Sequence, residues 1–72
     1  MIKQKILILK QDGEVGKYNL KFPSGTEFEI VADIVYMSGL PLPLEFQKVI
    51  YDWLVTNMSN QNMFREDLRR FN

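Results

Sequence analysis

Hydrophobic residues in this sequence follow two different periods, one in each half of the chain. In the first half they form short runs or alternate with polar residues, as Tyr18, Leu20 and Phe22 do. In the second half they recur every three or four positions. Alternation is typical of strands with one buried face, and the longer period is typical of amphipathic helices. The pattern predicts an α+β fold in a single domain of residues 1–72. We expect a small antiparallel three-stranded β-meander, an amphipathic helix packed on the sheet and a short C-terminal helix.

The start of the meander is defined by two apolar segments and a loop. Residues 2–10 are predicted as the first strand, because Ile6 to Leu9 are all aliphatic and a turn sequence follows them. Pro23-Ser24-Gly25 is predicted to join the second and third strands as a hairpin loop with Gly25 at positive φ. The resulting core-side pairs are Phe22 with Thr26, Leu20 with Phe28 and Tyr18 with Ile30, and the outer pairs are Lys21 with Glu27 and Asn19 with Glu29.

Residues 32–38 fit two structures. Their β-branched and aromatic side chains favour a strand that continues to about Tyr36. A helix over residues 27–38 also fits, because Thr26 and Glu29 resemble a capping box and Gly39 resembles a helix stop. We prefer the strand, since the hairpin register requires an extended chain through Ile30.

The second half of the chain carries the helical pattern. Pro43 suits the first turn of a helix, and the stripe at helical spacing after it consists of Phe46, Val49, Ile50, Trp53 and Leu54. This helix is predicted to cover the core face of the sheet. After a polar connection, a short closing helix is expected from Met63, Phe64, Leu68 and Phe71, with Glu66 paired to Arg70.

The composition removes most catalytic chemistry. Because the chain has no histidine and no cysteine, it cannot form a Ser-His-Asp triad, a Cys-His pair, a haem ligand or a conventional zinc site. Glu27 and Glu29 share one strand face, a spacing compatible with acid/base work, but a solvated face paired to lysines explains them more simply. The glycines and lysine of residues 13–17 match a hairpin loop better than a phosphate-binding loop. We therefore expect no enzyme activity, no cofactor and no metal.

Charge and hydropathy also bear on partners and location. The chain has a formal net charge of zero, and Glu27 and Glu29 partly neutralise the lysines on the outer face of the predicted sheet, so nucleic-acid binding is not expected. No apolar run approaches the roughly 18 residues of a membrane-spanning helix, and the first residues do not resemble a signal peptide. We expect a cytoplasmic protein. Its single alanine, Ala32, with many lysines, asparagines and isoleucines, is typical of the AT-rich coding sequences of a phage, a mobile element or an AT-rich bacterium. If the protein is encoded by a phage, we expect it in the host cytoplasm.

The outer face of the sheet is the predicted functional surface. If Ile6 and Ile8 face the core, Leu7 and Leu9 point outward. The predicted protein-binding residues are these two leucines with the surrounding charges, namely Lys3, Lys5, Leu7, Leu9, Lys17, Lys21, Glu27 and Glu29. Such a mixed patch suits a modest protein interface. The same leucines also fit a second core layer covered by the closing helix.

These expectations converge on a non-enzymatic protein-interaction module. We expect a small accessory protein of a phage or mobile element that docks on a larger protein and inhibits or adapts it. Two alternatives stay open, a small nucleic-acid-binding regulator and a structural subunit of a larger assembly, which includes a homo-oligomer.

Overall fold

The computed structural model describes residues 4–67. The fold class of these residues is α+β, as predicted. Their sheets contain more strands than the predicted three-stranded meander, and the described residues form a single α-helix where two helices were expected. The elements in chain order are β1 (Gln4–Leu9), β2 (Gly13–Val15), the 3-10 turn η1 (Gly16–Tyr18), β3 (Leu20–Phe22), β4 (Glu27–Val31), β5 (Ile34–Met37), β6 (Leu40–Pro41), α1 (Leu44–Asn57) and β7 (Phe64–Asp67).

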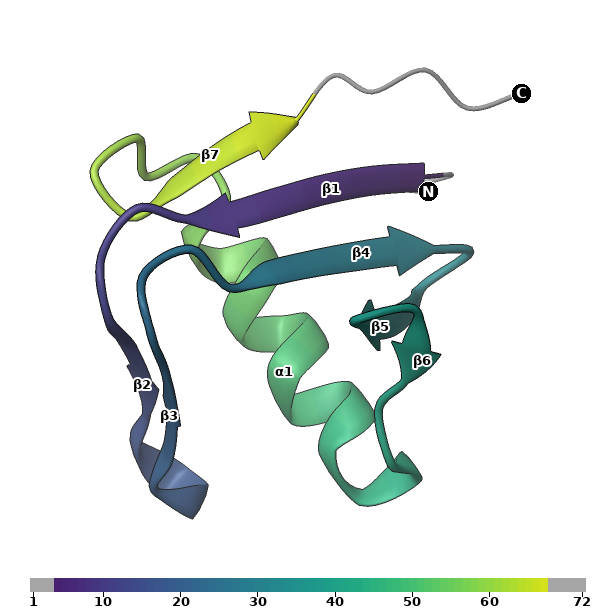
Figure 1. Ribbon diagram of the computed structural model, residues 1–72. Helices are drawn as coiled ribbons and strands as arrows, with labels where there is room; N and C mark the ends of the chain where they lie inside the picture. Colours follow the sequence, from purple (N-terminus) through teal and green to yellow (C-terminus); the bar gives the residue numbers. More distant parts are fainter. Residues whose placement is uncertain (1–3, 68–72) are drawn as a thin grey trace.

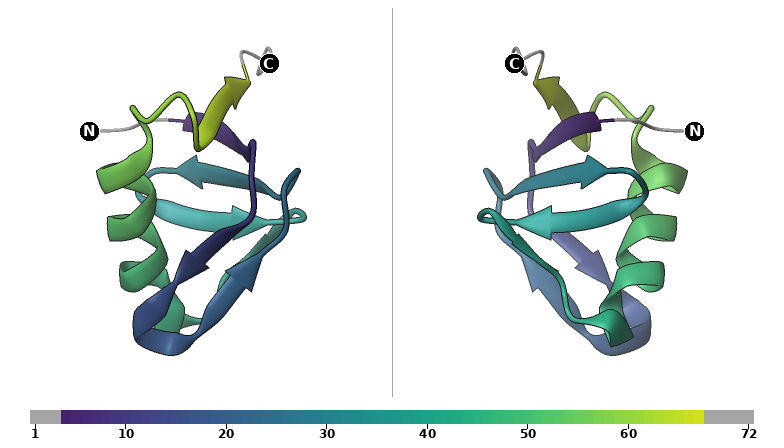
Figure 2. Two further views of the ribbon diagram at one scale, coloured as in Figure 1. Left: turned by 90° about the vertical axis from the view of Figure 1, so that its left-hand side faces the viewer. Right: turned by 90° about the vertical axis from the view of Figure 1, so that its right-hand side faces the viewer.

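The strands form one antiparallel five-stranded sheet and one two-stranded sheet. The larger sheet has the order β6-β5-β4-β1-β7, and the smaller one pairs β2 with β3. One long hairpin connects the two sheets. Its first leg runs through β1 and β2, and its second leg runs through β3 and β4. Figures 1 and 2 show that the two legs bend together, so that β2 and β3 form an arm beside α1.

A bulge produces this bend. The Leu9 N–H donates to the Thr26 carbonyl (2.9 Å), while the Gly25 N–H donates to the Leu9 carbonyl (2.8 Å). Two residues on one leg thus face one residue on the other, which bends a ladder and increases its twist. Gly25 has a φ of 93°, so the predicted positive φ is confirmed.

The predicted hairpin register is wrong. The turn at Pro23–Thr26 redirects one leg instead of reversing the chain, so residues 18–22 do not pair with residues 26–30. Phe28 lies opposite Leu7 in β1, and Leu20 lies opposite Val15 in β2. Leu7 and Leu9 consequently point into the core, where each is 1% exposed. Their predicted outward orientation is wrong for the same reason, since shifting a strand by one residue exchanges its faces.

Residues 32–38 contain two tight turns around a short strand. Ala32 and Asp33 have φ values of 50° and 67°, and Ser38 and Gly39 have values of 56° and 80°. Two successive positive φ values are what a type I′ hairpin turn requires. The preferred extended structure is right for residues 34–37, but the chain reverses at residues 32–33, and the alternative helix over residues 27–38 does not form.

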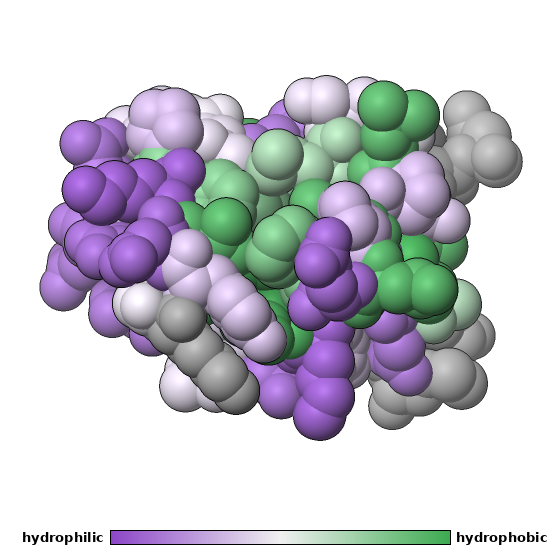
Figure 3. All heavy atoms as spheres, turned by 90° about the horizontal axis from the view of Figure 1, so that it is seen from below, coloured by the Kyte–Doolittle hydropathy of each residue, from purple (hydrophilic) through white to green (hydrophobic). Residues whose placement is uncertain are grey.

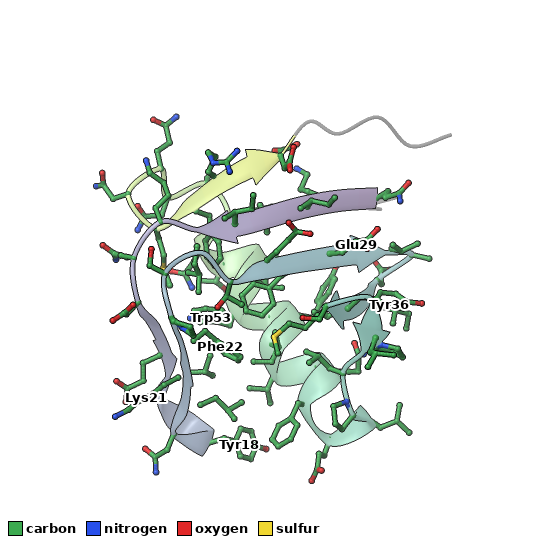
Figure 4. The ribbon with its side chains drawn as sticks, viewed as in Figure 1. Tyr18, Lys21, Phe22, Glu29, Tyr36 and Trp53 are labelled. Carbon is green, nitrogen blue, oxygen red and sulfur yellow. The ribbon has the colours of Figure 1, made fainter. Side chains whose placement is uncertain are left out.

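The helix predicted after Pro43 is confirmed. Ile50 and Leu54 are buried, and Phe46, Val49 and Trp53 pack against the core. Trp53 stacks on Phe22 with ring centroids 5.8 Å apart, and these two labelled side chains lie together below β4 in Figure 4. The helix spans 14 residues, and within the described residues no helix has the length and apolar character needed to cross a membrane.

The predicted C-terminal helix is wrong for its described part. Residues 64–67 form β7, which pairs antiparallel with β1 from Leu9 opposite Phe64 to Ile6 opposite Asp67. The ring of Phe64 meets that of Trp53 at a centroid distance of 5.5 Å, so an apolar residue expected on a helix stripe reaches the same core from a strand. Leu68, Arg70 and Phe71 lie outside the described residues.

Candidate functional site

The residues of the predicted protein-binding patch do not come together. Leu7 and Leu9 lie in the core, Lys5 is half-buried with its Nζ 3.5 Å from a carboxylate oxygen of Glu66, and Lys21 is exposed on the arm. Lys3 lies outside the described residues, as does the side chain of Lys17 in η1.

The predicted glutamates lie on a different part of the molecule from Lys21. Glu27 and Glu29 are half-buried on the outer face of β4, where Glu29 lies opposite Tyr36. Figure 4 shows Lys21 far from Glu29. Lys21 instead faces Glu14 across the arm. Among the described residues of the predicted patch, Glu27 and Glu29 share the outer face of β4, where both are half-buried.

The most exposed large apolar residues lie where β6 leads into α1, outside the predicted protein-binding patch. Leu40 is 70% exposed and Leu44 is 92% exposed. Together with the exposed Pro41 and Pro43 they form what we call the Leu-Pro ridge (Leu40, Pro41, Pro43 and Leu44). It lies at the lower right of Figure 1, where β6 leads into α1. From below, hydrophobic residues spread across the middle and right of this face, and hydrophilic residues crowd its left side (Figure 3).

The ridge is held firmly. Leu42, between the two prolines, points inward and packs against the core, and its N–H donates to the Val35 carbonyl (3.0 Å). The prolines fix φ on both sides of Leu42. The Phe46 N–H donates to the Pro43 carbonyl (2.9 Å) and begins the helix. Leu40 and Leu44 are therefore presented on rigid backbone, which lowers the entropy lost on binding.

A groove lies beside the ridge. It has a volume of about 350 Å³ and is lined by Asp33, Ile34, Leu44, Gln47, Lys48, Tyr51 and Asp52. Four of these residues lie at positions i, i+3, i+4 and i+7 of α1 and so share one helix face. This face adjoins the core-packing face, because its Tyr51 is half-buried and also packs against the core. The opposite wall comes from the turn between β4 and β5 and from Ile34, which is 42% exposed. We call this the α1–β5 groove.

The floor of the groove is fixed by the side chain of Gln47. The Val35 N–H donates to Gln47 Oε1 (2.8 Å), and Gln47 Nε2 donates to the carbonyls of Val35 (2.9 Å) and Leu42 (3.0 Å). The amide thus occupies the position that a longer β6 would take beside β5. It ties the helix to the sheet edge and holds the two walls of the groove at a set separation.

Tyr51 and Asp33 join the two walls at the rim. The Tyr51 hydroxyl donates to Asp33 Oδ1 (3.1 Å). Desolvation raises the pKa of Tyr51 above its ordinary value, and the hydrogen bond to Asp33 and the negative charges of Asp33 and Asp52 raise that pKa further. Asp52 also receives Lys48 Nζ at 3.1 Å.

No described group of side chains has the arrangement of a metal site. Within residues 4–67, no three carboxylates, histidines or cysteines lie close enough together to hold an ion. Two other hollows, of about 390 and 450 Å³, are each lined by residues of both charge signs. Their mixed linings point to no single ligand class.

Comparison with known proteins identifies no relative. No family model matches the chain, and neither the curated proteins nor the solved structures contain a match.

Sequence reasoning missed the ridge and the groove, although two signals were present. Leu44 falls outside the apolar stripe of its own helix, opposite Phe46, and Tyr51 lies seven residues after Leu44 on that second face. An apolar residue that does not fit the core stripe is a candidate surface contact. Asp33 and Ile34 gave no such signal, because their place beside α1 depends on how the sheet folds around the helix.

Proposed function

We propose that this protein is a non-enzymatic interaction module that docks on a larger protein through the Leu-Pro ridge and the adjoining α1–β5 groove. The exposure of Leu40 (70%) and Leu44 (92%) on rigid backbone carries the proposal. An isolated exposed leucine needs no explanation, but two of them lie on one short segment here, and Leu44 also lines a groove with charges at its rim. This arrangement matches the organisation of a protein interface.

Three lysines of the described residues are matched by carboxylates, which favours a protein partner over nucleic acid. Lys5 lies beside Glu66, Lys48 beside Asp52, and Lys21 opposite Glu14. Binding to nucleic acid draws its affinity from lysines and arginines that face phosphates together. Cations that are each matched by a neighbouring carboxylate supply little of that attraction.

A substitution pair tests the ridge. In Leu40→Thr/Leu44→Gln, both changes remove exposed apolar surface, and glutamine is a good helix former. We expect the melting temperature to stay within a few degrees of the wild type. We also expect the affinity for the partner to fall at least about tenfold, corresponding to roughly 1.4 kcal/mol.

The partner is first isolated by affinity capture and quantitative mass spectrometry, and its affinity is then measured with purified components. Val55→Thr is the matched control, because Val55 is an exposed apolar residue of the same helix outside the ridge. A partner bound equally well by the ridge variant and the wild type would disprove the proposed surface. A partner lost equally from the control would show that the effect is not specific to the ridge.

A further inference from the structure

The α1–β5 groove has an apolar wall and a single unbalanced charge. Its lining holds the carboxylates of Asp33 and Asp52 and the ammonium of Lys48. Lys48 pairs with Asp52, and in the described part of the chain the partner of Asp33 is the uncharged Tyr51 hydroxyl. One negative charge therefore stands at the rim without a cation.

The position of that carboxylate is fixed by the backbone. Asp33 is the second residue of the type I′ turn, with a φ of 67°, and it follows Ala32, another non-glycine residue at positive φ. Side chains other than glycine, asparagine and aspartate rarely adopt this conformation, and such strain concentrates at sites that bind ligands. The turn and the Tyr51 hydrogen bond together hold Asp33 over the groove.

A long side chain with an apolar stem and a cationic end matches this arrangement. Ile34 and Leu44 offer aliphatic contacts for a methylene stem, the Tyr51 ring lies on the same side as the charge, and Asp33 offers a carboxylate to the cation. The volume of about 350 Å³ is at the lower end for ligand sites, so it suits one side chain better than a large ligand.

The hydrogen bond that Asp33 already accepts bears on whether lysine or arginine binds in the groove. Asp33 Oδ1 already accepts the Tyr51 hydroxyl. An arginine binds a carboxylate best through two parallel hydrogen bonds that use both oxygens, whereas an ammonium needs only one point of contact. The Tyr51 hydroxyl already uses one lone pair of Oδ1, so a bidentate arginine would have to share that oxygen, whereas an ammonium can bind at Oδ2 alone. This favours lysine.

We infer that the α1–β5 groove receives a lysine side chain of the partner protein, with its stem on Ile34 and Leu44 and its ammonium on Asp33. That the lysine belongs to a partner protein rests on the proposed function. The groove itself is tested without the partner.

The test is an NMR titration of the ¹⁵N-labelled full chain with Nα-acetyl-lysine amide. A single side chain gives weak binding, so we expect saturable shifts with a Kd on the order of 1–10 mM. The shifts should centre on the amides of Asp33, Ile34, Leu44 and Tyr51. Nα-acetyl-norleucine amide has a similar stem without the charge, and we expect it to bind at least about fivefold more weakly. Nα-acetyl-arginine amide should also bind more weakly than the lysine compound.

Two variants make the test specific. Asp33→Asn keeps a side chain that tolerates positive φ and removes the charge, so the fold should remain while the lysine affinity falls at least about fivefold. Glu14→Gln removes an exposed carboxylate from the arm and should leave the affinity unchanged.

The outcomes separate this inference from the proposed function. Absence of shifts in the groove, equal binding of the norleucine compound, or unchanged affinity in Asp33→Asn would overturn the lysine site even if the ridge binds a partner. Tighter binding of the arginine compound would overturn the choice of lysine. Saturable, charge-dependent shifts would support the site even if the ridge substitutions left partner capture intact.

Discussion

At the scale of single residues, the contact between Tyr51 and Asp33 has a consequence for pH dependence. Desolvation, the Asp33 hydrogen bond and nearby negative charge all disfavour the tyrosinate, so the pKa of Tyr51 lies above its ordinary value of 10.0. A group whose pKa is higher in the folded than in the unfolded chain stabilises the fold at pH values below its pKa in the unfolded chain. This contribution is lost as pH rises through the folded pKa.

We expect Asp33→Asn to lower the pKa of Tyr51 towards its ordinary value, because the substitution removes the nearest charge and weakens the hydrogen-bond acceptor. The ¹³Cζ chemical shift of Tyr51 as a function of pH measures this directly. In the wild type the midpoint of this titration should lie above pH 10.0. Asp12→Asn, on the distant arm, serves as the control. An identical Tyr51 titration in wild type and Asp33→Asn would show that Asp33 does not set this pKa.

Residue-level patterns predicted much of the core but failed in β1 and at Tyr18, which was expected on the core face of a strand and is 45% exposed in η1. Phe28, Ile30, Ile50 and Leu54 are buried as expected, because alternation or helical spacing identifies their faces. In β1 every residue from Ile6 to Leu9 is aliphatic, so alternation cannot tell one face from the other. The assignment then depended entirely on the partner strand, and the wrong partner exchanged the faces.

At the scale of elements, the turns show which local signals are reliable. The positive φ at Gly25 followed from its residue type. The turn at residues 32–33 was missed because Ala32-Asp33 lacks the Asn-Gly or Asp-Gly sequence typical of type I′ turns. The alanine occupies a conformation that its Cβ disfavours, and the turn forms because β4 and β5 bury Ile30 and Val35 on either side of it.

Replacement of Ala32 by asparagine should therefore stabilise the protein. Asparagine adopts positive φ more readily than alanine, so we expect a gain of about 0.5–1 kcal/mol, or roughly 3–6 °C in melting temperature for a domain of this size. Ala32→Val is the matched comparison, because a β-branched residue at this φ should destabilise the turn. Denaturant unfolding measures both. Equal stability of the two variants would mean that the turn is not type I′.

At the scale of the whole molecule, the order of the strands could not be obtained from local patterns. β1 lies between β4 and β7, and β7 follows it by more than fifty residues in the chain. A strand that is apolar on both faces is typical of the interior of a sheet, where it has a neighbouring strand on each edge. The sequence does not indicate which segments are these neighbours. Residues 64–67 carry one apolar side chain followed by three charged ones, which fits a helix end as well as an edge strand. The antiparallel ladder that these residues form with β1 distinguishes the two.

Proline substitutions in β7 test this arrangement, because antiparallel ladders alternate between hydrogen-bonded and non-hydrogen-bonded pairs. The Lys10 N–H donates to the Met63 carbonyl (2.8 Å), so in the same register Arg65 and Ile8 form the next hydrogen-bonded pair. The N–H of Arg65 faces β1, and that of Glu66 faces away from the sheet. Arg65→Pro removes a ladder hydrogen bond, whereas Glu66→Pro removes an N–H on the open edge.

We expect Arg65→Pro to cost about 3 kcal/mol or more and Glu66→Pro to cost much less, apart from the modest surface pair with Lys5. Glu66→Ala isolates the loss of that pair, and urea unfolding followed by Trp53 fluorescence measures all three variants. In a helix beginning near Met63, both positions would fall in the first turn, where N–H groups have no intrahelical partner, and both prolines would be tolerated. Equal stability of Arg65→Pro and Glu66→Pro would therefore contradict the pairing of β7 with β1, and with it the position of β1 between two strands.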